Sequence, residues 1–115
     1  MRSVIIEMHG TRYAAEVADS AATRSKGLLG RRSLPKNAAM LIQPSNSIHT
    51  MFMRFSIDVV YLNAEDIVIK VVRHLKPYRF SWGGFRAKSV IELASGSAPA
   101  DLAPGSKVRI EHPLP

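Results

Sequence analysis

Short apolar runs, separated by turn-forming residues, recur along the whole chain, and this spacing is typical of a protein built mainly from strands. The chain opens with apolar runs at residues 3–8 and 13–18. The intervening residues His9-Gly10-Thr11-Arg12 favour a turn, so we expect an opening hairpin. A third run at residues 38–42 is short and wholly apolar, which predicts a buried strand.

One early segment, residues 21–29, predicts a helix instead of a strand. Asp19 or Ser20 offers an N-cap in front of it, because a short polar side chain can accept a hydrogen bond from the first turn. Gly27 or Gly30 offers the end, since glycine is favoured just past the last helical residue. We therefore expect a single short helix near residues 20–30.

The middle of the chain carries the clearest alternation. From Thr50 to Leu62 every second residue is apolar, which predicts one long strand. Residues 63–66 supply turn formers, and residues 67–73 are rich in β-branched side chains. The two runs together predict a central hairpin.

The last third predicts one long loop and two more strands. Residues 76–85 mix aromatic side chains with glycines and have no period, which is typical of an ordered loop. Residues 89–93 and 107–112 predict strands. We expect a mostly β (α+β) single domain over residues 1–115, with about seven short strands in a compact antiparallel sheet that curls into a barrel or folds as a sandwich.

Composition narrows the chemistry. The 115 residues include no cysteine, which excludes disulfides, thiolate metal sites and a cysteine nucleophile. The four histidines show no metal-ligand spacing, so we expect neither a metal nor a cofactor. No apolar stretch approaches a secretory signal or the length of a membrane span. We expect a cytoplasmic protein; export stays open if the chain is a trimmed mature form.

Positive charge is concentrated in two windows. The net charge is +7, and eleven of the sixteen cations lie from Arg24 to Lys36 and from Lys70 to Lys88, where no acid occurs. Two such windows that meet in space would attract phosphates or nucleic acid. The alternative is a solvated surface that keeps the protein soluble.

Several stretches together resemble a known family. They are Gly27-Leu28-Leu29-Gly30-Arg31, Met40-Leu41-Ile42, His49-Thr50-Met51-Phe52-Met53-Arg54-Phe55 and Ile57-Asp58-Val59-Val60-Tyr61-Leu62. The chain resembles domain of unknown function 192, an uncharacterised ancient conserved region, from about residue 15 to residue 110. The resemblance implies a compact, strand-built single domain and no established reaction. Ser56 stands where the family often has proline, and Ser106 where it usually has an acid.

Three polar residues of the central segment are candidates for a site. Asp58 lies within an apolar run, where a carboxylate needs a partner or a change in ionisation. It either accepts backbone N–H groups in a structural role or orients a ligand. Arg54 would lie on the same strand face about 13 Å away. His49 suits acid–base chemistry, or else bonds to the backbone of its loop.

Three later residues are further ligand-binding candidates. Arg79 and Trp82 belong to a loop that interleaves arginines with aromatic rings, a pattern that stacks bases or sugars and also folds a loop over a small core. Glu92 lies in the apolar run at residues 89–93, either as a ligand residue or as the partner of a basic strand residue.

These observations favour a small non-catalytic binding module with a polar pocket near His49, Arg54 and Asp58. Its ligand would be small and anionic or sugar-like, or a protein partner would take its place. A nucleic-acid-associated protein that uses the two basic windows is the first alternative. An enzyme that uses Asp58 and His49 on a small polar substrate is the second.

Overall fold

A computed structural model describes residues 2–111 and places them in a mostly β fold with one short helix. This confirms the predicted fold class, with nine strands in place of about seven. In chain order the elements are β1 (Ser3–Met8), β2 (Thr11–Ala18), α1 (Ala21–Lys26), β3 (Ala38–Ile42), β4 (Ser47–His49), β5 (Ile57–Leu62), β6 (Val68–Leu75), β7 (Phe80–Trp82), β8 (Ser89–Ala94) and β9 (Val108–Glu111). The predicted last strand extended to His112, which lies outside the described residues.

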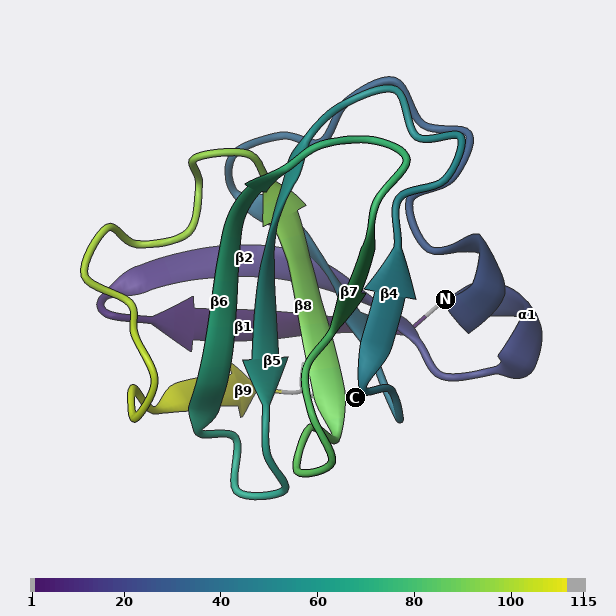
Figure 1. Ribbon diagram of the computed structural model, residues 1–115. Helices are drawn as coiled ribbons and strands as arrows, with labels where there is room; N and C mark the ends of the chain where they lie inside the picture. Colours follow the sequence, from purple (N-terminus) through teal and green to yellow (C-terminus); the bar gives the residue numbers. More distant parts are fainter. Residues whose placement is uncertain (1, 112–115) are drawn as a thin grey trace.

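Seven strands form one curled sheet, in the order β6-β5-β8-β3-β2-β1-β9. Its first half stands steeply across its second half, so that β1, β2 and β9 cross behind β5, β6 and β8 (Figure 1). The two edges meet at one end, where Ile67 and Lys107 form an antiparallel bridge. The N–H of Val68 donates to the carbonyl of Ser106 at 2.8 Å beside it. The sheet is therefore a half-barrel with its edges tied together at one end.

The predicted hairpins are confirmed. At the opening turn, His9 and Gly10 both have positive φ, 48° and 82°, the conformation of a two-residue hairpin turn that follows the twist of the strands. The central hairpin joins β5 to β6, whose β-branched residues suit the pleated surface. The predicted helix also forms, and Ser20 and Thr23 make reciprocal side-chain to backbone hydrogen bonds at its start.

One pair of strands corrects the expectation of an antiparallel sheet. β2 and β3 run parallel, with Ala14 opposite Ala38 and Ala18 opposite Ile42. A parallel pair needs a connection that returns the chain to the same end of the sheet, and α1 lies in that connection. The helix between these two strands was expected, but the parallel pairing was not, because no local pattern specifies which strands become neighbours.

The long central strand is the second correction, because β5 begins only at Ile57. Residues 51–56 form turns and bends, and Phe52 has a φ of 64°, which lies outside the β region. Met53 is buried while Met51 and Phe52 are exposed, so the apolar alternation does not mark one sheet face. The residues pack as a compact turn whose apolar spacing resembles that of a strand.

Two short strands form a second sheet that we did not expect. β4 pairs with β7 antiparallel, with Ile48 opposite Ser81 and His49 opposite Phe80. The residues around β7 were expected as a loop without strands. Gly83 closes the turn after β7 against the ring of Tyr61, because a Cβ at position 83 would come within 2.2 Å of that ring. Only glycine allows this approach.

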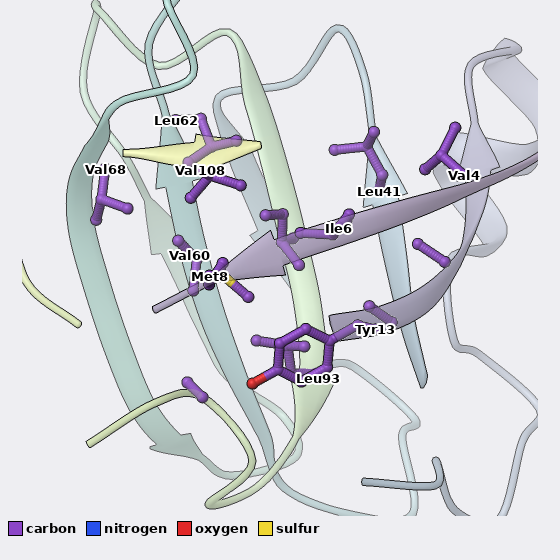
Figure 2. Close-up of a cluster of buried hydrophobic side chains, with 14 of the residues drawn as sticks. Val4, Ile6, Met8, Tyr13, Leu41, Val60, Leu62, Val68, Leu93 and Val108 are labelled. Carbon is purple, nitrogen blue, oxygen red and sulfur yellow. The ribbon is translucent and has the colours of Figure 1, made fainter. Parts of the chain in front are cut away.

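The buried side chains form two clusters on opposite faces of the large sheet. The first lies inside the curl, where Ile6, Met8 and Tyr13 face Val60 and Leu93 (Figure 2). The second lies on the other face, under α1 and the β4–β7 pair, and has these members: Ala18, Leu28, Leu34, Met40, Ile42, Ile48, Met53, Ile57, Val59, Tyr61, Ala87 and Val90. β5 and β8 separate the two clusters and are buried on both faces.

Candidate functional site

A single acid lies in the second cluster. Glu92 is the fourth residue of β8, with Met40 of β3 and Val59 of β5 as its neighbours across the sheet. Side chains opposite each other on antiparallel strands share a face, so Glu92 points to the side that α1 covers. Its exposed fraction is only 3%.

The carboxyl group of Glu92 is poorly satisfied for so buried a group. Among residues 2–111 its Oε1 has no hydrogen-bond partner. Burial raises the pKa of Glu92 to about 7, because the charged form loses its hydration without gaining a compensating partner. At neutral pH the group is therefore protonated far more often than an ordinary glutamate.

Glu92 lies at a cavity of about 310 Å³ between α1 and β4. Gly27, which ends α1, shares this cavity. Its φ of 48° and ψ of −126° suit glycine, and a Cβ at this position would lie 3.4 Å from Oε1 of Glu92. The glycine thus ends the helix and leaves room beside the carboxyl group.

The remaining polar groups of the cavity are basic or neutral. Arg24 and Lys26 from α1 and His49 from β4 line it, and Glu92 is the one acid among its described lining residues. His49 accepts a hydrogen bond at Nδ1 from the N–H of Met51, at 3.2 Å. The neutral ring therefore carries its proton on Nε2. The cavity combines a buried acid with a positively charged lining.

Asp58 has a different position from the one that the predicted pocket required. It is fully buried on β5 opposite Leu93, on the face inside the curl and away from Glu92. Its Oδ1 accepts from the N–H of His74, and its Oδ2 accepts from the N–H groups of Gly96 and Ala98, all at 3.0 Å. These three bonds hold the loop after β8 against the end of β6, which is the structural alternative given for Asp58.

The predicted grouping of His49, Arg54 and Asp58 is therefore corrected. His49 lines the cavity, Asp58 lies on the opposite face of the sheet, and Arg54 is exposed on the turn before β5. Their proximity was inferred from one continuous strand, and that strand is broken by the turn at residues 51–56.

Arg79 and Trp82, two further ligand-binding candidates, do not line the cavity. Trp82 is 45% exposed on β7, and Arg79 is exposed just before that strand. Of the six candidates, the structure brings together Glu92 and His49. Arg24 was noted only as part of a basic window, and Gly27 only as a helix end. Placing them beside Glu92 needs the crossover between β2 and β3, which no local pattern specifies.

The two basic windows flank β4. The first contributes Arg24 and Lys26 to the cavity on one side, and the second includes β7, which pairs with β4 on the other. Several of their cations already bond within the protein; Arg24 donates to the carbonyl of Asp19 and Lys70 to that of Trp82. Arg31 forms an ion pair with Glu16 at 2.8 Å, and Arg73 donates to four carbonyl oxygens of residues 98–102.

The described part of the chain contains neither a metal-binding cluster nor a helix that could span a membrane. Within residues 2–111, no three His, Asp or Glu side chains cluster closely enough to hold a metal ion. In the same part of the chain, no helix has the length and apolar character that crossing a membrane requires.

A half-barrel sheet with a small cavity under its single helix is a fold shared with other proteins. Residues 4–110 match the family of domain of unknown function 192, described as an uncharacterised ancient conserved region. The chain belongs to this family, which confirms the resemblance found in the sequence.

Two relatives bear the UPF0127 name. A UPF0127 protein of Pyrococcus horikoshii is 37% identical over 85 residues, which cover 70% of this chain and 71% of that protein. A UPF0127 protein of Pyrococcus furiosus is 33% identical over 90 residues, which cover 74% and 75%.

Two crystal structures share the fold. A protein of unknown function from Novosphingobium aromaticivorans has a TM-score of 0.78 at 22% identity, over 93% of this chain and 83% of that chain. A candidate transcription regulator from Sinorhizobium meliloti has a TM-score of 0.83 at 15% identity, over 95% and 92%. At these identities the likeness concerns the fold alone.

Proposed function

We propose that the protein is a binding module for a small polar ligand, held in the cavity between α1 and β4. The ligand carries a hydrogen-bond donor, a hydroxyl or an amine, at its inner end and a negative charge at its outer end. The observation that carries this proposal is the unpartnered, buried carboxyl group of Glu92 beside a cavity lined by cations.

The inner end follows from the chemistry of Glu92. A buried polar group without a partner costs free energy, and a ligand that donates to Oε1 recovers that cost on binding. The pKa of about 7 lets the carboxyl group accept from a hydroxyl or, when ionised, pair with an amine. An apolar ligand would leave this oxygen unsatisfied.

The outer end follows from the charges of the lining. Arg24 and Lys26 flank the cavity and supply two positive charges. A cavity of about 310 Å³ is at the small end of the range for ligand pockets. Hydroxy acids, amino acids and small sugar phosphates meet all three requirements.

A thermal-shift screen at pH 7 with glycerate, glycine and glycerol 3-phosphate tests the proposal. We expect at least one of them to raise the melting temperature, because a ligand that binds only the folded state stabilises it. Glycerol alone supplies only the hydroxyl groups, and inorganic phosphate alone supplies mainly the negative charge. Each should raise the melting temperature less than a complete probe does. No shift with any of the three complete probes would contradict the proposal.

Variants locate the binding in the cavity. Glu92→Gln and Arg24→Ala should each weaken the stabilising probe at least about tenfold, since each removes a charged hydrogen-bond partner. Arg109→Ala is the matched control. Arg109 lies on β9, pairs with Glu7 and Glu111, and does not line the cavity. Equal weakening by the control would assign the effect to net charge instead of the site.

A second candidate function is an enzyme that uses the same cavity, with Glu92 in place of Asp58 as the acid–base group. The observation that favours it is the pKa of about 7, which suits proton transfer at neutral pH. Mass spectrometry of the stabilising probe after long incubation distinguishes the two. A binding module returns the probe unchanged, whereas conversion that Glu92→Gln abolishes identifies an enzyme.

A further inference from the structure

The β4–β7 pair presents large apolar side chains to solvent. Six of them are between 41% and 86% exposed: Met51, Phe52, Tyr78, Phe80, Trp82 and Phe85. We call the five rings among them the aromatic platform. Single exposed apolar residues are ordinary, but a group of rings on one small sheet and its flanking turns indicates an interaction surface. In Figure 1, β7 lies on one side of β4 and α1 lies on the other.

Four of the five rings form two edge-to-face pairs. Phe52 and Tyr78 meet edge to face at 5.6 Å between centroids, and Trp82 and Phe85 do so at 4.9 Å. Phe80 shares the outer face of β7 with Trp82, while Ser81 between them points inward to the hydroxyl of Tyr61. Residues two apart on a strand are separated by about 6.6 Å, so the rings of Phe80 and Trp82 are spaced by about that distance along β7.

The turns that carry the platform are fixed by Thr50. This buried residue exchanges backbone hydrogen bonds with the segment before β7, where its carbonyl accepts from the N–H of Tyr78 and its N–H donates to the carbonyl of Arg79, both at 2.8 Å. Its hydroxyl donates to the carbonyl of Lys76 at 2.6 Å and accepts from the N–H of Arg79 at 2.9 Å. The platform is thus preorganised, which lowers the entropy lost on binding.

Positive charge surrounds the platform. The two segments that build it, residues 47–57 and 67–91, contain no acid. Lys70 donates from Nζ to the carbonyl of Trp82 at 2.8 Å, which places its charge at the edge of the rings. Arg54, Lys76, Arg79 and Arg86 are also exposed. Such a field selects a polyanion.

We infer that the aromatic platform binds single-stranded nucleic acid, with bases stacked on the exposed rings of β7 and phosphates held by the surrounding cations. Small sheets bind single strands in this way, by exposed strand aromatics that each stack one base. A surface for an apolar protein partner would not need so uniform a positive field. Polar Ser47 and His49 face Trp82 and Phe80 across the sheet, which suits base edges better than lipid chains.

Fluorescence anisotropy with a labelled oligothymidylate of roughly 12 nucleotides tests the inference. Contact with three or four phosphates should weaken binding roughly 20- to 50-fold between about 50 and about 200 mM salt. Phe80→Leu and Trp82→Leu keep an apolar side chain but lose the ring, and each should weaken binding roughly fivefold to a hundredfold, the effect of losing one stacked base. Arg109→Ala, the matched charge control on β9, should change the affinity less than twofold.

Cosedimentation with vesicles that contain phosphatidylserine tests the competing occupant. An anionic membrane would tolerate the leucine variants, because leucine also inserts into lipid. No retention of the oligonucleotide at low salt, or affinity that the leucine variants leave unchanged, would overturn the inference. Because Glu92→Gln should leave oligonucleotide binding intact, failure here and failure of the small-ligand cavity are separate outcomes.

Discussion

Gly27 lies directly against the carboxyl group of Glu92, so that a side chain at position 27 would begin 3.4 Å from Oε1. One residue ends α1 and the other lies in the buried centre of β8. The contact joins a helix end to the acid of the second core cluster. The glycine keeps the space beside the carboxyl group free of a side chain, at the point where Glu92 borders the cavity.

Gly27→Ala should therefore remove ligand binding. It should also lower the free energy of unfolding by about 1–3 kcal/mol, because its backbone conformation is one that alanine adopts only with strain. Gly30→Ala is a matched control, since Gly30 has a φ of 89° but open space around its Cβ position. Chemical denaturation and the thermal-shift assay should report a stability loss for both variants and a binding loss for Gly27→Ala alone. Unchanged binding in Gly27→Ala would place the ligand elsewhere.

The stability of the protein should depend on pH through Glu92. Its pKa is about 7 in the folded chain against an ordinary value of 4.5, so the folded state binds more protons between these values. The favourable contribution of Glu92 to the free energy of unfolding is complete below pH 4.5 and is lost as the pH rises to about 7. The full change is of the order of 3 kcal/mol.

Glu92→Gln removes this titration. The unfolding free energy of the wild type, measured relative to Glu92→Gln, should fall by that amount from about pH 4 to about pH 8. Glu16→Gln, which removes a partly exposed ion pair with Arg31, serves as the control and should keep the pH dependence of the wild type. A constant difference between the wild type and Glu92→Gln across this range would mean that Glu92 is not buried without a partner.

Asp58→Asn should destabilise the fold and leave the cavity on the other face intact. The three backbone N–H groups that Asp58 binds would meet an amide in place of a carboxylate oxygen. A loss of at least about 2 kcal/mol is expected from unsatisfied buried donors. Asp19→Asn, which alters an exposed pair with Arg2, should cost less than about 1 kcal/mol in the same urea titration. Normal stability with lost ligand binding would instead make Asp58 a functional residue.

Thr50→Val should loosen the segment before β7. The substitution keeps the shape of the side chain but removes the hydroxyl that bonds to Lys76 and Arg79. Amide hydrogen exchange at Arg79 should accelerate at least about tenfold, and oligonucleotide affinity should fall with it. Thr50→Ser keeps the hydroxyl and should behave like the wild type. Equal exchange in the two variants would show that the backbone bonds alone fix this segment.

The sequence predicts well those elements whose partners are close along the chain. The opening hairpin and the β5–β6 hairpin each combine apolar runs with a short turn, so local pattern and pairing agree. The β4–β7 pair was not predicted, because two strands of three residues are too short to show alternation. Their partners are also more than 30 residues apart, and only tertiary packing brings them together.

The overextended central strand has a different cause. The spacing of Met51, Met53 and Phe55 fits a strand, yet the positive φ of Phe52 breaks it. Apolar spacing reports which residues are suited to burial, and does not by itself distinguish a strand from a tight turn.

The candidate site was predicted in part. Asp58 and Glu92 carry the same signal, a lone acid in an apolar run, but opposite outcomes follow from the strand register. Asp58 faces a loop that offers three N–H groups, whereas Glu92 faces a helix end that offers space. No local pattern distinguishes these two environments, since both are created by residues distant in the sequence.

The carbon-13 NMR titration of the Glu92 side-chain carboxyl group tests the central claim most directly. We predict a midpoint near pH 7 in the free protein, and a change in that midpoint when the stabilising probe is added. Arg109→Ala should reproduce both results. A midpoint near the ordinary value of glutamate, unchanged by any of the probes, would contradict the account of Glu92 as the unpartnered acid of a ligand site.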